Sequence, residues 1–274
     1  ILGGELNMPE VEAYGAQPPI ELMRQLIDNG GWYDLKEKTW RTIIDTTVVS
    51  AMGPPGGGRN FVTPRLLRHF NLFCFSEFDD HTLEKIFSTI VSWHLTGNTF
   101  GGDVRSMGDS IVDATLDTYR AAMANLLPTP AKSHYTFNLR DFSRVIQGVL
   151  LCRPQEGFNK NSLIRLWVHE AMRIFSDRLI DDKDKMWFHE HIMGVVNSRF
   201  GSNFYDVFKR LDSGTEKTVT FTDMRSLIFG DFMAEQDPRF YEEITSQEAL
   251  QDKMEEASRM IKRDIVFAAS LYTQ

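Results

Sequence analysis

The sequence predicts an α/β region followed by an all-α region, and three observations support this fold class. A β-branched run, Ile43-Ile-Asp-Thr-Thr-Val-Val49, leads into a glycine-dense loop at residues 51–59. A short basic helix then begins at Thr63-Pro64, so strand, loop and helix follow in the order that α/β nucleotide enzymes use to bind phosphate. From Asp79 onward, apolar residues recur at helical spacing instead.

The first region, residues 1–78, is predicted to be the carboxyl-side part of an α/β core. Pro18-Pro19 begin a helix and Gly30-Gly31 end it, with Ile20, Met23 and Ile27 on its buried face. Residues 46–52 are predicted to form a buried strand, and residues 72–75 another.

The second region, residues 79–200, is predicted to be a helical domain. Asp79-Asp80 offer an N-cap for a helix that runs to Gly97, and residues 97–108 are expected to form a mobile glycine-rich loop. Pro128 and Pro130 end a second helix, and Asn138 caps a third. Further helices are expected at about 161–180 and 183–199, and their tryptophans and phenylalanines belong to the core. Residues 201–274 are expected to connect to another module, with a possible first strand at residues 227–233.

Composition excludes several function classes. The formal net charge of −8 argues against a nucleic-acid partner, since such binding depends on Lys and Arg neutralising phosphates. No apolar run approaches the ~20 residues that span a bilayer, so no membrane partner is expected. Cys74 and Cys152 are predicted to be buried reduced thiols, and no metal site is expected because His169-Glu-Ala-Met-Arg173 lacks the second histidine of a zinc motif. Because the chain begins at Ile1 and not at a methionine, we expect a fragment of a longer protein.

The glycine-dense loop is not a complete phosphate-binding loop. It lacks the Gly-Lys-Ser/Thr that would place a lysine on the phosphates and a hydroxyl on Mg²⁺. We therefore expect no nucleotide to bind tightly to this chain alone, and no ATP hydrolysis by it.

Several long motifs flank this loop. They are Leu6-Asn-Met-Pro9, Tyr14-Gly-Ala-Gln-Pro-Pro-Ile-Glu-Leu-Met-Arg-Gln25, Gly31-Trp-Tyr-Asp34, Leu127-Pro-Thr-Pro-Ala-Lys-Ser-His-Tyr-Thr-Phe-Asn-Leu-Arg-Asp141 and Arg144-Val-Ile-Gln-Gly148. Together they resemble the third AAA+ module of a dynein heavy chain, axonemal more than cytoplasmic, from about Leu6 to Glu256. The resemblance implies a partial AAA+ P-loop NTPase core without its Walker A half, a helical lid at 79–200, and the start of the next module at 201–274.

In the intact parent, the resemblance implies an ATP-binding regulatory module of a minus-end-directed microtubule motor. The expected cofactors are ATP or ADP with Mg²⁺. The expected partners are neighbouring AAA+ modules, microtubules, and dynein intermediate and light chains, in the cytoplasm, the cytoskeleton and the axoneme of a cilium or flagellum. Two alternatives stay open: a non-catalytic ring scaffold, and a truncated interaction fragment without ATPase activity.

The same resemblance proposes roles for three arginines. Arg140 matches the sensor II residue, which reaches the γ-phosphate of the module's own ATP, and a guanidinium supplies the required permanent charge and several donors. Arg65 and Arg68 lie three residues apart on one helix, and one of them is placed like the arginine finger that enters a neighbouring module's site. The alternative for this pair is a solvated basic helix face.

The remaining candidates lie at the predicted strand ends. Glu5 matches the catalytic glutamate of the Walker B motif, but Gly4 stands at the metal position and offers Mg²⁺ no side-chain oxygen. Either the first four residues are foreign to the protein or hydrolysis at this module is impaired. Gly53, Gly56, Gly57, Gly58, Arg59 and Asn60 occupy the sensor I region. Two interpretations of this region are equal alternatives. In one, Gly53, Arg59 or Asn60 contacts the nucleotide; in the other, the glycine loop is purely structural.

Overall fold

The computed structural model describes residues 2–54, 59–212, 218–233 and 239–271. The chain divides into two compact units, Ile1–Glu77 and Phe78–Gln274, and each is described by itself. The elements of the amino-terminal unit are β1 (Leu2–Gly3), α1 (Pro18–Asn29), β2 (Gly31–Tyr33), β3 (Trp40–Thr42), β4 (Val49–Ser50) and α2 (Pro64–Leu67).

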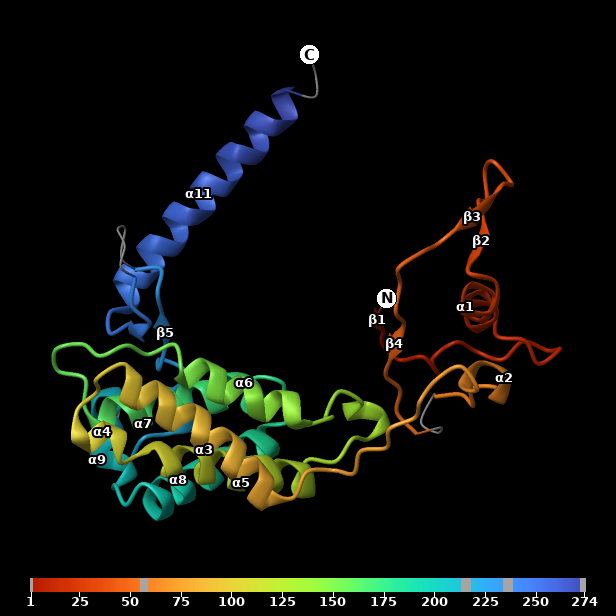
Figure 1. The fold of residues 1–274 in the computed structure, drawn as a ribbon. Coiled ribbons are helices and arrows are strands. Elements are labelled where there is room, and N and C mark those ends of the chain that lie inside the picture. The colour runs from red at the N-terminus through yellow and green to blue at the C-terminus, as the bar shows by residue number, and fades with distance from the viewer. Residues whose placement is uncertain (1, 55–58, 213–217, 234–238, 272–274) are drawn as a thin grey trace. The chain divides into compact units, whose positions relative to one another are not determined.

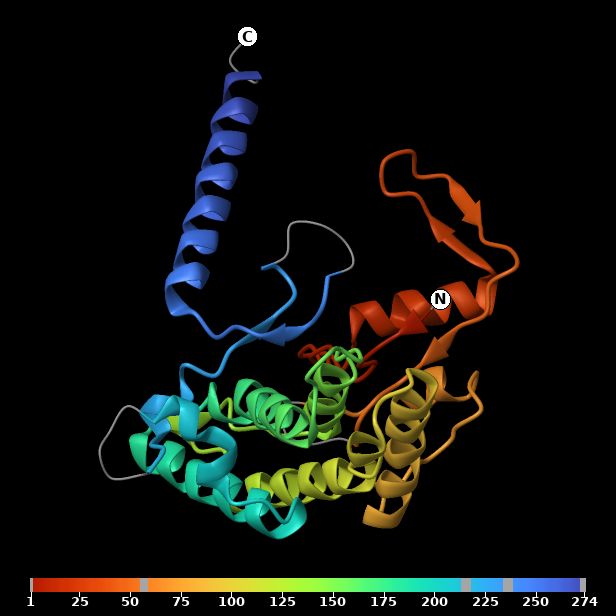
Figure 2. The same ribbon diagram turned by 90° about the vertical axis from the view of Figure 1, so that its left-hand side faces the viewer.

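The strands of the amino-terminal unit form two pairs. β1 runs parallel to β4, with Leu2 opposite Val49 and Gly3 opposite Ser50. β2 and β3 form an antiparallel hairpin that follows α1 directly (Figure 2). A Cβ at Gly31 would lie 2.2 Å from the carbonyl oxygen of Arg41, so this hairpin requires glycine there.

The predicted helix at Pro18 is confirmed as α1. Proline occupies its first position, and Gly30 ends it in the left-handed conformation at φ 69°. Ile20 is buried in a small core with Leu6, Val62 and Leu66, against which Met23 and Ile27 are partly buried.

Two strand predictions in this unit are wrong. Residues 46–52 contain only the two-residue β4, and Val49 is 58% exposed instead of buried. Residues 72–75 form no strand, and Phe73, Cys74 and Phe75 are all exposed. A buried parallel strand needs neighbours on both edges and cover on both faces, and in the described residues β4 pairs with β1 alone.

The carboxy-terminal unit is a helical bundle followed by a small hairpin and a long helix (Figure 1). Its bundle elements are α3 (Asp80–Gly97), α4 (Gly102–Arg105), α5 (Gly108–Asn125), η1 (Pro130–Lys132), α6 (Leu139–Val149), α7 (Lys160–Ala171), the π-helical turn η2 (Met172–Ser176), α8 (Asp182–Arg199), α9 (Phe204–Phe208), η3 (Lys209–Leu211) and α10 (Phe221–Met224). The hairpin pairs β5 (Phe229–Gly230) with β6 (Glu242–Glu243), and α11 (Gln247–Leu271) follows.

Helix α5 is central to the bundle because it contacts α3, α6 and α8, while α6 packs on α7. Trp167 of α7 is fully buried and donates a 2.9 Å hydrogen bond to the hydroxyl of Thr115 in α5. Phe142, Phe175 and Phe188 are also buried, which confirms the core prediction for Trp167 and Phe188, while Trp187 is partly buried against that core.

The predicted helix starts at Asp79 and Asn138 are confirmed, since each side chain accepts a backbone N–H of its helix's first turn. The mobile loop predicted at residues 97–108 is wrong. It contains α4 and buries Phe100, Val104 and Met107 in the core, so apolar packing outweighs the glycine content. The strand predicted at residues 227–233 is shorter, limited to β5. In the described part of the chain, no helix combines the length and hydropathy that crossing a bilayer requires.

Candidate functional site

The parallel pairing of β1 and β4 brings two predicted site residues to one edge. Glu5 follows β1 and Gly53 follows β4, and parallel strands end at the same side of a sheet. The pairing continues past the strands, because Ala51 donates to the carbonyl of Gly3 at 2.9 Å and Leu6 donates to that of Ala51 at 3.2 Å. Glu5 and Gly53 therefore lie at the carboxyl ends of neighbouring strands, where α/β folds bind ligands.

Glu5 is engaged by Arg59 in a two-pronged ion pair. The guanidinium donates from Nε to Oε2 at 3.0 Å and from Nη2 to Oε1 at 3.2 Å. The hydrogen bonds and the positive charge of Arg59 hold the pKa of Glu5 below its ordinary value. The side chains stay 48% and 41% exposed, so the pair can open without desolvating a charge.

Gly53 makes room for this ion pair. A Cβ at Gly53 would lie 3.0 Å from Nε and 3.2 Å from Cζ of Arg59. A residue absent from the predicted site, Asn7, fixes Gly53 by donating to its carbonyl at 2.7 Å. Asn7 lies inside the motif Leu6-Asn-Met-Pro9, which is the sequence signal that could have identified it.

Asn60 also has a defined position. Its side-chain amide donates to the carbonyl of Pro9 at 3.0 Å, and its backbone N–H donates to the carbonyl of Asn7 at 2.8 Å. The structure therefore brings together Glu5, Gly53, Arg59 and Asn60, while Gly56, Gly57 and Gly58 lie outside the described residues.

These residues fit the phosphate side of a nucleotide better than a magnesium ion. A guanidinium offers the planar fork of donors that phosphate oxygens accept. Among the described residues, no group of three or more His, Cys, Asp and Glu side chains could hold a metal ion, and Gly4 adds no oxygen. The ion pair contacts both carboxylate oxygens and lowers the pKa of Glu5, so Glu5 is a weaker base while it is bound to Arg59.

The two candidate fingers on α2 differ in their contacts. Arg68 donates to Asp28 at 3.0 Å and to the ring of His69 at 3.2 Å. Burial raises the pKa of Asp28, but the hydrogen bond from Arg68 and the nearby positive charges outweigh burial and lower it. Arg65 is exposed and has no hydrogen-bond or ion-pair partner among the residues described. The structure thus distinguishes a paired Arg68 from an unpaired Arg65.

Arg140, in the carboxy-terminal unit, is the second residue of α6. Its backbone N–H donates to the side-chain oxygen of Asn138 at 2.9 Å, whereas its side chain is exposed. The capped first turn of α6 fixes the backbone of Arg140, while its exposed guanidinium can still reach a ligand.

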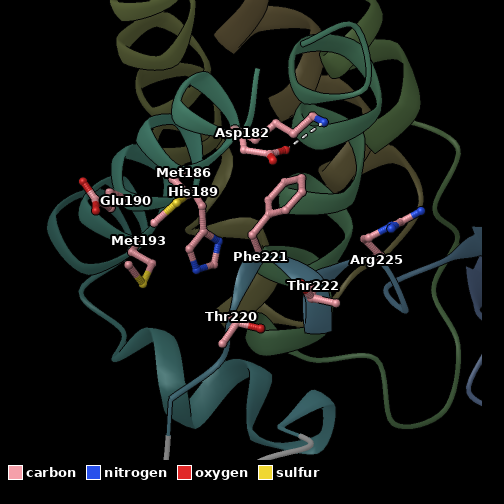
Figure 3. A pocket seen from close by; sticks show the side chains of 10 residues that line it. Asp182, Met186, His189, Glu190, Met193, Thr220, Phe221, Thr222 and Arg225 are labelled. Carbon is pink, nitrogen blue, oxygen red and sulfur yellow. Dashed lines mark hydrogen bonds and ion pairs between the residues drawn. The ribbon is translucent and has the colours of Figure 1, made fainter. Parts of the chain in front are cut away.

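A separate pocket of about 620 Å³ lies between α8 and α10 of the same unit (Figure 3). Its walls combine Met186, Met193 and Phe221 with the ring of His189, and an ion pair joins Lys185 to Asp182. Burial lowers the pKa of His189 although its ring is hydrogen bonded to the carbonyl of Val219 at 3.0 Å. None of the predicted site residues lines this pocket, so we assign it no part in nucleotide binding.

Comparison with known proteins gives two family matches and a set of close relatives. Residues 4–78 match the P-loop containing dynein motor region, and residues 111–210 match the AAA+ lid domain. The chain is 50% identical over 243 residues to dynein axonemal heavy chain 12 of Mus musculus, and the aligned residues are 88% of this chain and 8% of that protein. It is 49% identical over 252 residues to dynein axonemal heavy chain 3 of Homo sapiens, covering 92% of this chain and 6% of that one. Identity to dynein axonemal heavy chain 1 of Mus musculus is 42% over 264 residues, again 92% of this chain and 6% of the relative. The chain thus spans less than a tenth of the length of these relatives.

Proposed function

Because this chain is homologous to a segment of the axonemal dynein heavy chains, we propose that it works as part of an ATP-driven motor ring. Residues 1–78 form the carboxyl-side part of one AAA+ core, residues 79–200 its lid, and residues 201–274 the start of the next module. The module is the third of the ring, and the parent moves towards microtubule minus ends in a cilium or flagellum.

The observation that carries this proposal is the meeting of Glu5, Gly53 and Arg59 at one edge of the β1–β4 pair. A carboxylate at a strand end beside a partly exposed guanidinium provides a general base and a phosphate-binding cation. ATP, when bound, supplies the phosphoryl group whose transfer to water drives movement of the ring. Glu5 leaves Arg59 to accept a proton from the attacking water, and Arg140 detects whether the γ-phosphate is present.

The test uses the complete heavy chain that carries this sequence, with Glu5→Gln and Arg140→Ala compared with Glu10→Gln. Glutamine keeps the shape of Glu5 but cannot accept a proton, so we expect slower microtubule gliding with nucleotide still bound. Glu10 is exposed and makes no described contact with the cluster, so its variant controls for loss of a surface charge. Gliding and ATP turnover unchanged in both Glu5→Gln and Arg140→Ala would exclude a regulatory ATPase role.

A second candidate is a non-catalytic module that only completes the ring. Gly4 favours it because the metal position has no side-chain oxygen, and so does the ion pair that occupies Glu5. In that case Glu5→Gln leaves gliding unchanged, while removal of the whole module prevents ring assembly.

For the polypeptide by itself we propose no ATP turnover, because the printed sequence contains no Gly-Lys-Ser/Thr. The test measures phosphate release from ATP by the purified chain. Turnover that copurifies with the chain and disappears in Glu5→Gln would contradict this.

A further inference from the structure

We infer that Arg178 is a positioning residue for Arg140 and acts through the buried carboxylate of Asp141. This inference rests on the proposed function of Arg140 as a nucleotide sensor. It concerns the segment between η2 and α8, to which neither the sequence motifs nor the proposed site assigns a role.

The first turn of α6 is held by a reciprocal cap. The side chain of Asn138 accepts the N–H of Arg140 at 2.9 Å, and the side chain of Asp141 accepts the N–H of Asn138 at 3.0 Å. Such a capping box satisfies helix N–H groups that would otherwise lack partners. Arg140 lies between the two capping residues, so the geometry of the cap sets the origin of its side chain.

Asp141 is also bound from outside its helix. Arg178 donates from Nη2 to Oδ1 at 2.8 Å and from Nη1 to Oδ2 at 3.4 Å. The carboxylate is 5% exposed, and a buried carboxylate needs a charged partner far more than a surface one does. The same guanidinium donates to the carbonyl of Thr136 at 3.4 Å and lies 5.1 Å from the ring centre of Phe137. Arg178 therefore holds both the cap and the chain that leads into it.

A second set of contacts holds the same two segments together. Lys132 donates to Asp184 at 2.6 Å, and the hydroxyl of Tyr135 donates to the same carboxylate at 3.0 Å. That hydroxyl accepts the N–H of Ile180, also at 3.0 Å. Residues 132–141 are thus fixed along residues 178–184, and Asp141 is the point where this attachment meets the helix of Arg140.

The consequence for nucleotide sensing is geometric. An arginine side chain is long and flexible, so its contact with a phosphate depends on a fixed starting point. In Arg178→Gln, Asp141 keeps its bond to the cap but loses its charged partner. The first turn of α6 then loses its direct attachment to the segment 178–184, which Lys132 and Tyr135 hold only before the helix begins. Contacts to the γ-phosphate weaken, while contacts to the part of the nucleotide that ADP shares with ATP do not depend on Arg140.

The experiment uses the complete heavy chain carrying this sequence and measures the dissociation of fluorescent ATP and ADP analogues by stopped flow. The dissociation phase that Arg140→Ala alters is assigned to this module. We expect Arg178→Gln to speed ATP-analogue dissociation in that phase by about tenfold, the factor that corresponds to about 1.4 kcal/mol. The ADP-analogue rate should stay unchanged, and Arg178→Lys should restore part of the difference. Arg199→Gln, which breaks the ion pair with Asp117 elsewhere in the lid, is the matched control.

The double variant separates positioning from general stability. If Arg178 acts through Arg140, adding Arg178→Gln to Arg140→Ala produces no further change. An equal effect of Arg178→Gln in both backgrounds, or an equal effect on both analogues, would overturn the inference and leave a structural ion pair. If Arg140→Ala alters no phase, the proposed sensor function itself fails. Should Arg178→Gln not fold, the same comparison is made with Arg178→Lys, whose single ammonium cannot reproduce the two-pronged contact.

Discussion

The guanidinium of Arg59 binds the carboxylate of Glu5 through two hydrogen bonds, although 54 residues separate them in the chain. The two residues follow β1 and β4, which are parallel and end at the same edge. The glutamate proposed to act as the base is therefore held by a cation from the glycine-rich loop.

The first prediction concerns the titration of Glu5. Arg59→Ala removes the hydrogen bonds and the charge that lower its pKa, so that pKa should rise towards the 4.5 of an unperturbed glutamate. Carbon NMR of the chain labelled in glutamate carboxyls measures this directly. Gly53→Ala should raise the pKa too, since its methyl group displaces the guanidinium, whereas Arg65→Ala should not. A pKa of Glu5 that stays low in Arg59→Ala would show that another group stabilises the carboxylate.

The second prediction distinguishes the two arginines of α2. Asp28 engages Arg68, while Arg65 extends from the helix unpaired within the described residues, so we propose Arg65 as the finger. In the complete heavy chain, Arg65→Ala should slow turnover at the neighbouring module by about a hundredfold or more if that module hydrolyses ATP. Arg68→Ala should have a much smaller effect. The reverse order of effects would assign the finger to Arg68.

The third prediction concerns a buried hydrogen-bond network of the carboxy-terminal unit. Glu170 accepts a 2.7 Å hydrogen bond from the hydroxyl of Tyr241 and contacts the ring of His169 at 3.1 Å. Burial, followed by the hydrogen bond to Glu170, raises the pKa of Tyr241 above its ordinary value. Tyr241→Phe leaves the buried carboxylate short of a donor and should lower the free energy of unfolding by about 1–3 kcal/mol in urea titrations. Tyr205→Phe, which loses a 3.2 Å bond to Asp212, should cost less, and equal losses would show that Glu170 finds another donor.

The fourth prediction concerns the pH dependence of stability. Burial lowers the pKa of His189 in the folded chain below the value of about 6.5 expected when unfolded. The unfolded chain therefore binds more protons below pH 6.5, and the contribution of a neutral His189 is complete above that pH and lost as the pH falls. Urea midpoints at pH 7.5 and 5.5 should differ less in His189→Gln than in the unaltered chain. His81→Gln, at an exposed position of α3, is the control, and an identical pH dependence in His189→Gln would contradict the prediction.

Local signals in the sequence predicted the helices better than the strands. Asp79 and Asn138 mark helix starts because the capping side chain and the N–H groups it binds lie within a few residues of each other. The apolar run at residues 72–75 also looks like a buried strand, but a strand depends on partners that a short pattern does not contain. Cys74 is exposed for that reason, against the prediction that it is buried.

The candidate site was predictable only in part for a similar reason. Glu5 and Arg59 were each identified by motif, but their ion pair depends on the pairing of β1 with β4. Arg178 carried no signal at all, because its contact with Asp141 spans 37 residues and arginine is a common surface residue.

The two cysteines give the chain a built-in means of selective labelling. Burial raises the pKa of the Cys152 thiol to about 12, so at neutral pH this residue stays protonated and does not react with a maleimide dye. Cys74 is exposed and free, and it lies in the amino-terminal unit. A maleimide fluorophore therefore attaches at one site, and its signal reports on that unit without any engineered cysteine.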